Sequence, residues 1–598
     1  MIKFKPQHLS PSPITTLPTL GAPYGLSTPP LAEYSLQTQG TQIMPPPYGK
    51  NPWTDKPLPT IFAKPNQGVV YDTIQPKPKS AHEIINGFRH VVIDTSDVRG
   101  GKGDVAANYL LAMTIMQTWN YQGQLTIIGT PQSIAILSSL SGQSLKSGSH
   151  LFSDLARIHQ VNKLPTELPP TDLYIGLARR SGTLNALVPG SIQPSSRRYR
   201  PVEVRLEKLP NRGLGVNLSA EATIVAMPVF ENVECRDLNY PHGLILTGDT
   251  RAEIRKPGLT GRSAGIYHDP VAAQLRDKTE SEVIRIAKLA LMAMPDHPYS
   301  QKLSSIIDGE LLQGADFSFA YVPTVQRAKS QVRSYLQGMI DHINKAGQDQ
   351  KSMVLVTTSN LPGSTVSMLK SNLNRLVFID NEQEIPQTAK PGTLYILQVG
   401  AIPHSLFNCF LALSEYPPVV SGDGGLSAAL ILGKPFVMAE ISTNRQQIQV
   451  MNYHLGQLDP ANTDLYGTRT NLTAALGAAY RLMNPETRAA FASLIDYYED
   501  FAEVLIDSIG AAREYNKRKN KPTEGMASEI ATIKDMALRI SLLLDMACNG
   551  DHEALRHLAY EFRKDNALFR QAYSRGIIPE KLFKHKRMQR LLSLVLRD

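Results

Sequence analysis

The stretch PVVSGDGGLSAALILGKPFVMAE, Pro418–Glu440, decides the fold predicted for this chain. It opens with a short apolar run that is typical of a buried strand, and a polar turn, 421–425, follows. A helix-like run then extends to Gly433, where a second apolar run begins after Lys434-Pro435. The order strand, glycine turn, helix, strand predicts one βαβ unit of a parallel sheet.

The turn itself is Ser421-Gly422-Asp423-Gly424-Gly425. Glycines let the backbone come close to a ligand, and the free N–H groups at the start of a helix attract anions. The turn therefore predicts a phosphate-binding corner. Because short glycine motifs are weakly specific, a tight connection without a ligand is the alternative.

Composition allows a large folded protein of several domains. The chain has 598 residues, of which 42% are hydrophobic and 19% charged, and a net charge of +9. This mild basic bias favours acidic or phosphate-bearing partners, but it does not predict nucleic-acid binding. The three cysteines are far apart and form no CxxC pair, which indicates synthesis in a reducing compartment and no zinc knuckle.

The first 85 residues are rich in Pro, Thr, Ser, Gln and Gly and show no sustained hydrophobic period. We expect them to be largely disordered; a docking tail or translocation signal is the functional alternative. The N-terminus has no apolar region of a Sec signal, and no apolar run reaches the length of a membrane span. We expect a cytoplasmic protein, or one that enters a host cell without a cleaved Sec signal, as a bacterial effector does.

Strand-like and helix-like runs alternate over most of the remaining chain, which predicts an α/β fold with two Rossmann-like domains. The first would span 86–315 and the second 316–483. The pattern of the second starts at Phe317. From 484 to 598 helical periods dominate, so we expect a helical C-terminal region.

A second candidate site follows the first predicted strand, Val91–Asp94. Its loop contains Asp97 and ends in Gly103-Asp104, before a helical pattern that begins at Val105. In an open α/β sheet this loop lies at the ligand crevice. The run GGKGD lacks the spacing and the Lys-Ser/Thr pair of a Walker A motif, and it is not GxGxxG.

The C-terminal segment Lys581–Leu596 combines five cations with an apolar stripe. Such a basic amphipathic helix could contact a membrane surface or an acidic partner. Packing against the other predicted helices is the alternative.

Four stretches resemble GT-B glycosyltransferases: the loop ending in Gly103-Asp104, FSFAYVP at 317–323, GAIPHSLFNCFLALSEYPPVV at 400–420, and SGDGGLSAALILGKPFV at 421–437. The last is similar to the donor-domain pattern of that fold, including the protein-arginine rhamnosyltransferases. The resemblance spans roughly 88–480. It implies that an acceptor domain, 86–315, and a donor domain, 316–483, face each other across a cleft, with a nucleotide-sugar between them.

The chain departs from the pattern in two places. Many GT-B enzymes carry a ribose-binding Glu in the corner helix, where this chain has Ala428 and Ala429. Glu440 is our candidate for that role. The spacing of Asp97 and Asp104 also differs from that of the arginine-modifying family, so the resemblance leaves the acceptor open, with a protein as one possibility.

The resemblance implies transfer from a nucleotide-sugar with inversion and without a metal or other cofactor. The diphosphate would be bound by the backbone at Gly422, Gly424 and Gly425 and by the hydroxyl of Ser427, within a site that also includes Gly103, Ser421, Asp423 and Glu440. Asp104 or Asp97 would deprotonate the acceptor. For Asp104 and Asp423 a helix N-cap is the structural alternative, and for Arg445 a surface role is the alternative to phosphate binding.

Two other functions remain open from the sequence. One is a non-catalytic nucleotide- or sugar-binding protein of GT-B architecture, in which the tail and the basic helix supply interactions. The other is a nucleotide-sugar epimerase, for which the required acidic and histidine groups cannot be placed.

Overall fold

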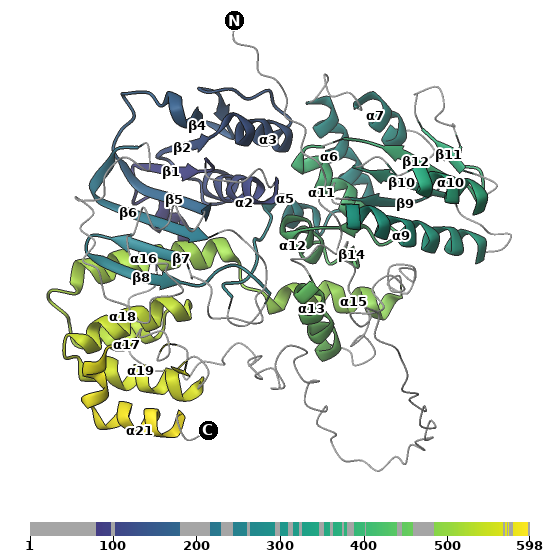
Figure 1. Cartoon of the computed structure of the whole chain (residues 1–598). Coiled ribbons are helices and arrows are strands. Elements are labelled where there is room, and N and C mark those ends of the chain that lie inside the picture. The colour runs from purple at the N-terminus through teal and green to yellow at the C-terminus, as the bar shows by residue number, and fades with distance from the viewer. Residues whose placement is uncertain are drawn as a thin grey trace, which may run out of the picture. The chain divides into compact units, whose positions relative to one another are not determined.

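The chain is described here by a computed structural model, drawn in Figure 1, in which Ile61–Asp598 forms one compact unit. The structure describes residues 79–96, 102–179, 216–228, 243–259, 263–293, 300–308, 315–321, 326–345, 352–358, 361, 363–372, 376–379, 388–400, 402–438, 445–458, 484–565, 569–570, 572 and 578–595. The expected disordered segment, 1–85, lies outside the described residues except for its last seven.

The first sheet has eight strands in the order β3-β4-β2-β1-β5-β6-β7-β8. Neighbours from β4 to β6 are parallel, whereas β3, β7 and β8 each run antiparallel to the strand beside them. The strands are β1 His90–Asp94, β2 Gln124–Gly129, β3 His150–Leu151, β4 Ser153–Gln160, β5 Thr171–Arg179, β6 Leu218–Pro228, β7 Gly243–Thr247 and β8 Thr250–Ile254.

The second sheet has six strands, all paired in parallel, in the order β11-β12-β10-β9-β13-β14. The strands are β9 Ala315–Ala320, β10 Ser352–Thr357, β11 Leu376–Phe378, β12 Leu394–Gln398, β13 Val419–Val420 and β14 Val437–Met438. The predicted α/β class with two mainly parallel sheets is confirmed.

Helices connect these strands and continue beyond them. They are α1 Ala81–Ile85, α2 Lys102–Met113, α3 Pro131–Ser141, α5 Pro270–Leu275, α6 Glu280–Met292, α7 Ser300–Asp308, α9 Gln326–Lys345, α10 Gly363–Asn372, α11 His404–Leu413, α12 Asp423–Ile431, α13 Arg445–Leu458, α15 Pro485–Leu494, α16 Phe501–Arg518, α17 Met526–Ala531, α18 Met536–Cys548, α19 His552–Lys564 and α21 Lys586–Val595. Short 3₁₀ turns are η2 Val161–Lys163, η8 Ile495–Tyr497 and η9 Glu580–Lys584, and α2 ends in a π-helical segment, η1 Thr114–Thr118.

Burial explains why the central strands read as continuous apolar runs. In β1, Val91 and Ile93 belong to one hydrophobic core and Val92 to the core on the opposite face of the sheet. Every residue of β9 and β10 is buried. Strands covered on both faces need apolar side chains at successive positions, which is the pattern that the sequence shows.

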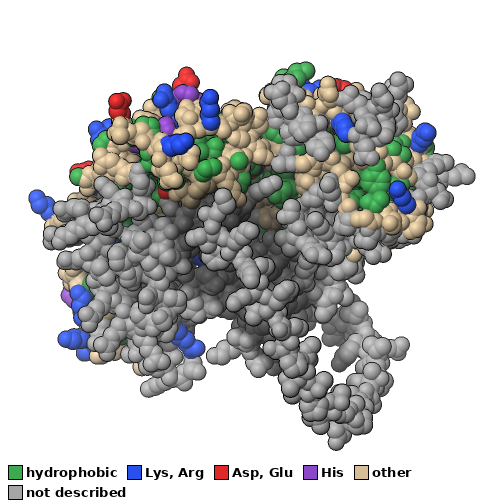
Figure 2. Space-filling model, turned by 45° about the horizontal axis from the view of Figure 1, so that its top comes forward, with side chains coloured by type: hydrophobic (Ala, Val, Ile, Leu, Met, Phe, Trp, Pro, Cys, Tyr) green, Lys and Arg blue, Asp and Glu red, His purple; other side chains and the backbone are tan. Residues whose placement is uncertain are grey.

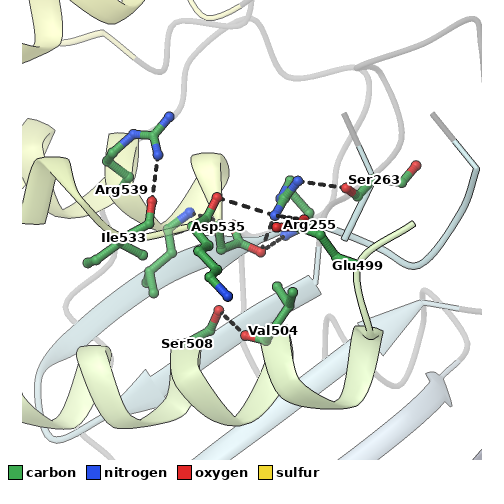
Figure 3. A network of polar contacts seen from close by, with 10 residues as sticks. Arg255, Ser263, Glu499, Val504, Ser508, Ile533, Asp535 and Arg539 are labelled. Atoms are coloured by element: carbon green, nitrogen blue, oxygen red, sulfur yellow. Dashed lines mark hydrogen bonds and ion pairs between the residues drawn. The ribbon is translucent and has the colours of Figure 1, made fainter. Parts of the chain in front are cut away.

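The C-terminal helices pack against the first sheet. Residues from Phe501 to Met588 share a core with β1, β2 and β5, and in Figure 1 the yellow helices α17–α21 lie beside the β8 edge. The guanidinium of Arg255, just after β8, is buried and donates to Ser263 O (2.6 Å) and to a Glu499 carboxylate oxygen (3.0 Å). Its backbone N–H donates to Asp535, which caps α18 (Figure 3). A buried, paired cation therefore fixes this junction.

The helices α5, α6 and α7 pack with the second sheet, because their buried apolar residues, from Ala272 to Ile307, lie in the same core as β9 and β10. Buried residues between Leu259 and Tyr267 belong to both cores, so the core changes just before α5, earlier in the chain than the expected domain boundary at 315. Similarly, α15 shares the second core, whereas α16 belongs to the first. The divisions 86–315, 316–483 and 484–598 stay predictions about separate domains.

Several elements differ from the expected pattern. In the predicted helical region, 484–598, the helix breaks after α15 and η8, and α16 starts anew at Phe501 with Asp500 as its N-cap. The sequence pattern marked no element at β3, β4, β8 or α3. The first part of β4 is exposed, so β4 has no continuous apolar run to mark it.

Candidate functional site: a glycine turn at a switch point of the second sheet

The predicted corner is a sharp turn between β13 and α12. Gly422 has φ 94° and ψ 168°, a conformation that belongs essentially to glycine, and it is the N-cap of α12 without a side-chain cap. The first N–H that bonds within the helix is that of Leu426, which donates to Gly422 O at 3.1 Å. The N–H groups of residues 423–425 therefore lack the i−4 carbonyl that later residues have.

The space around this turn is open. A Cβ built on Gly422 or Gly424 would meet no atom within 4 Å. At Gly425 it would lie 3.4 Å from Val420 Cβ and 3.5 Å from Phe407 Cζ, in ordinary contact with the protein. Two of the three glycines thus border free volume next to the exposed helix N–H groups, which is the geometry of an anion site.

The side chains of the corner differ in what they offer. Ser421 is buried, and its hydroxyl donates to Tyr321 O at 3.4 Å, which attaches the turn to the end of β9. Ser427 is also buried, one turn into α12. The prediction that Asp423 is the N-cap is wrong, because the helix begins at Asp423 and Gly422 is its cap; the Asp423 side chain lies outside the described part.

The position of this turn in the second sheet also favours a ligand site. The strands β10, β11 and β12, which follow β9 in the chain, all lie on one side of β9. The next strand, β13, lies on the other side of β9. The strand order therefore reverses between β9 and β13. In open α/β sheets, ligands bind at the carboxyl ends of the strands at such a switch point, and Ser421 and Gly422 directly follow β13.

The loop predicted in the first sheet also follows a switch point, because β2 and β5 lie on opposite sides of β1. Asp94, the last residue of β1, is buried and accepts hydrogen bonds from Ser96 N (2.7 Å) and from the hydroxyl of Tyr174 on β5. No local sequence pattern indicates this pair. Asp97 lies outside the described residues.

Gly103 and Asp104 lie in the first turn of α2, which begins at Lys102. A Cβ on Gly103 would meet nothing within 4 Å, and Asp104 is half-buried. The alternative that Asp104 is an N-cap is wrong, because Asp104 is already inside the helix. Its carbonyl accepts a hydrogen bond from Asn108 Nδ2 at 2.9 Å.

A buried polar cluster that the sequence reasoning missed lies next to the corner. Asp269, the N-cap of α5, is fully buried, and its carboxylate lies 2.7 Å from Nε2 of His404 and accepts from Asn408 Nδ2 at 3.0 Å. His404 begins α11 and stacks on Phe407, the residue that contacts the start of α12.

The charge state of this cluster follows from its contacts. Burial by itself would raise the pKa of Asp269, but the charge of His404 and hydrogen bonds from His404, Asn408 and the Ala272 N–H together lower it. Asp269 is therefore an ionised buried carboxylate. The ring of Tyr109, on α2, lies 5.9 Å from that of His404, and α2 also contacts α12. These contacts link the helix that carries Asp104 to the helices of the corner.

Two further observations concern a single histidine and metal binding. His268 donates its backbone N–H to Asp500 at 3.4 Å, and burial raises the pKa of Asp500. Within the described residues, no three His, Cys, Asp or Glu side chains cluster as metal ligands would. Glu440 and the Arg445 side chain lie outside the described part. None of the described helices is long and apolar enough to cross a membrane.

Comparisons with known proteins give distant likenesses. No protein-family model matches the chain, and no curated protein matches it. Among solved structures it is similar to an alpha,alpha-trehalose 6-phosphate synthase from Burkholderia multivorans (9% identity, TM-score 0.32, 72% of this chain and 100% of that one). It is also similar to a putative UDP-N-acetylglucosamine 2-epimerase from Listeria monocytogenes (10%, 0.32, 72% and 97%) and to S. aureus MnaA in a co-structure with UDP (13%, 0.34, 72% and 97%). All three TM-scores are below 0.5, so these similarities do not indicate a function.

Proposed function

We propose that this protein is a glycosyltransferase that binds the diphosphate of a nucleotide-sugar at the N-terminus of α12. One observation supports the proposal above the others. The turn at Gly422 combines open volume, helix N–H groups without i−4 partners and a place at the switch point between β9 and β13. Such a turn favours a ligand with concentrated negative charge.

The proposed chemistry is a displacement at the anomeric carbon. The acceptor oxygen forms a bond to that carbon while the bond to the diphosphate breaks, and the nucleoside diphosphate leaves with the bonding electrons. The N–H groups of residues 423–425 would stabilise the charge that develops on the leaving group. Asp104 is the proposed base that takes the acceptor's proton, with Asp97 as the other candidate. We propose that no metal takes part.

The finer assignments rest on the sequence resemblance alone. They are ribose recognition by Glu440, a protein as acceptor, and the likeness to arginine rhamnosyltransferases. We propose a protein acceptor on that ground and leave the sugar open.

A second candidate function has its own supporting observation. Ala428 and Ala429, where many GT-B enzymes have a ribose-binding Glu, are both completely buried. A corner helix that offers no acid at these positions also suits a protein that binds a nucleotide or a sugar without transferring it.

A screen of nucleotide-sugars distinguishes the two functions. Thermal shift reports binding of the UDP, GDP and dTDP sugars, and release of free nucleoside diphosphate reports turnover. A transferase binds and slowly hydrolyses at least one of them, whereas a binding protein gives a shift without hydrolysis. A chain that binds none of them contradicts both functions.

A further inference from the structure

The basic character of the protein is concentrated at its C-terminal end. Residues 551–598 contain 11 Lys and Arg against six Asp and Glu, so they contribute +5 of the net +9 of the whole chain. These residues include α19, η9 and α21. The positive charge is thus concentrated in one region of the chain. The arrangement of its cations on the folded surface decides what this region can bind.

At least three of the six acids of this region make contacts within the protein. Asp551 caps α19 by accepting from Glu553 N and Ala554 N, both at 2.9 Å. Glu553 accepts from Ser528 Oγ at 2.7 Å, and Glu561 is paired with Arg539 at 3.0 Å. Their negative charge therefore stabilises a helix end and contacts with neighbouring helices.

The cations, in contrast, face outward. Exposed Lys and Arg side chains that form no ion pair within the described part of the chain are Arg556, Arg563, Lys564, Lys584, Lys586, Arg587 and Arg590. Met588, on the side of α21 away from these cations, is completely buried, so α21 packs on the protein through that residue. On the face drawn in Figure 2, the lower left of the molecule shows Lys, Arg and His side chains and no Asp or Glu.

The two helices present these cations together. The rings of His552, which begins α19, and His585, which precedes α21, lie 5.8 Å apart, and the helices are in contact. On α19 the exposed stripe is Arg556, Tyr560, Arg563 and Lys564, at helical spacing, and Tyr560 is 63% exposed. We call this combined surface of α19, η9 and α21 the basic surface.

The start of α21 is also locally unfavourable. Its first two residues are Lys586 and Arg587, and its first turn contains no acid. Cations next to the positive end of a helix dipole destabilise the helix, and Lys584 directly precedes them. Where a chain breaks a local rule without an internal compensation, function is the common reason. An external anion at this helix end would remove the conflict.

We propose that the basic surface docks the protein on a membrane that contains anionic phospholipids. Lipid phosphates would lie at the N-terminal end of α21, and the amphipathic ring of Tyr560 would lie at the level of the headgroups. This binding is peripheral, because Met588 of α21 is buried in the protein.

A membrane fits these observations better than a nucleic acid does. The exposed cations of α19, η9 and α21 lie on elements in contact with one another, which suits a layer of anionic headgroups. Proteins that bind single-stranded nucleic acid use a basic groove with several stacked aromatic side chains, and the described part of the basic surface offers one exposed aromatic, Tyr560.

The test is co-sedimentation of the full-length chain with vesicles of phosphatidylcholine, with and without phosphatidylserine. We expect binding only when phosphatidylserine is present, and loss of binding at high salt. Replacing Lys584, Lys586, Arg587 and Arg590 with Ala should lower the partition coefficient about a hundredfold or more. The matched control removes four exposed cations elsewhere: Arg276, Lys278, Arg285 and Lys370, also to Ala. It should bind as the wild type does.

The melting temperature separates docking from a structural role. Because Lys586 and Arg587 oppose the helix dipole, the double variant K586Q/R587Q should melt at the same or a higher temperature and still bind about twentyfold more weakly. This double variant also serves if the fourfold variant does not fold. The proposal is overturned if the wild type binds vesicles equally well with and without phosphatidylserine, or if the variants bind as well as the control. It is also overturned if the protein binds single-stranded RNA more tightly than the vesicles.

Discussion

The carboxylate of Asp269 lies 2.7 Å from Nε2 of His404, in a part of the second core where Asp269 is fully buried. The pair joins the start of α5 to the start of α11. His404 lies one helical turn before Phe407, the residue that contacts Gly425 of the glycine turn. The two residues are 135 positions apart in the chain, yet they fix the element that supports the proposed anion site.

Removing the Asp269 carboxylate should strongly destabilise the protein. Asp269→Ala leaves the His404 and Asn408 donors and two helix N–H groups without their acceptor, and breaking a buried pair in this way costs about 3–5 kcal/mol. Urea unfolding measures the change. The control Lys278→Ala breaks an exposed pair with Glu282 and should cost less than about 1 kcal/mol. Equal losses in the two variants would show that Asp269 is not a structural centre.

The same carboxylate predicts a dependence on pH. Its pKa is lower in the folded protein than its ordinary value of 3.8, so its stabilisation is present above about pH 4 and is lost as the pH falls through the folded pKa. The stability difference between the wild type and Asp269→Asn should therefore shrink below about pH 4. A difference that stays constant down to that range would contradict an ionised Asp269.

His454 predicts a second, separate pH effect. It is buried in α13, its Nδ1 lies 2.7 Å from the Tyr498 hydroxyl, and burial lowers its pKa to about 4. Between pH 6.5 and 4 the unfolded chain takes up a proton that the folded chain does not, so stability should fall by about 1.4 kcal/mol per pH unit. Unfolding at several pH values should show a smaller slope in His454→Gln and no change in the exposed-site control His552→Gln. An unchanged slope in His454→Gln would refute the assignment.

The two open glycines of the corner should respond differently to alanine. At Gly422 the backbone conformation is essentially restricted to glycine, so Gly422→Ala should cost about 1–3 kcal/mol in spite of the free space. Gly424 is in the helix without a positive φ, so Gly424→Ala should be neutral or stabilise by up to about 1 kcal/mol. Thermal unfolding of both variants tests the geometry of the turn, and a reversed order would mean that the turn is built differently.

Asp104→Ala tests the proposed base. For whichever donor is hydrolysed or transferred, kcat should fall by about 10²–10⁴ while the affinity for the nucleoside diphosphate stays the same. The half-buried side chain lies in the first turn of α2, so the loss of stability should be no more than about 1 kcal/mol. Full turnover in a folded Asp104→Ala protein would remove Asp104 from the mechanism and leave Asp97 to be tested.

The sequence predicted the central strands and the corner well because each has a local signal. A continuous apolar run marks a strand that is buried on both faces, as in β1, β9 and β10, and a cluster of glycines marks a turn such as that at Gly422. The helix starts were less accurate: α2 begins three residues before the expected Val105, and α12 begins at Asp423 itself.

The remaining features depend on tertiary structure. The Asp269–His404 and Asp94–Tyr174 pairs join residues that are far apart in the chain, and no local pattern links them. Likewise, the helical periods of 484–598 do not reveal that α15 packs on one core and α16 on another, because an amphipathic face does not specify its partner. The strands β4 and β8 were missed because partly or fully exposed positions interrupt any apolar run in them.

The central claim is that the N-terminus of α12 binds the diphosphate of a nucleotide-sugar, and calorimetric titration of a nucleoside diphosphate into Gly424→Val tests it most directly. The Cβ of the valine would meet no atom within 4 Å, so we expect the fold to persist while the ligand is excluded. The account predicts that UDP, GDP or dTDP binds the wild type and the control Ala489→Val, whose exposed position lies on α15, but not Gly424→Val. If none of the three binds the wild type, or if Gly424→Val binds with unchanged affinity, the diphosphate site is not at this corner.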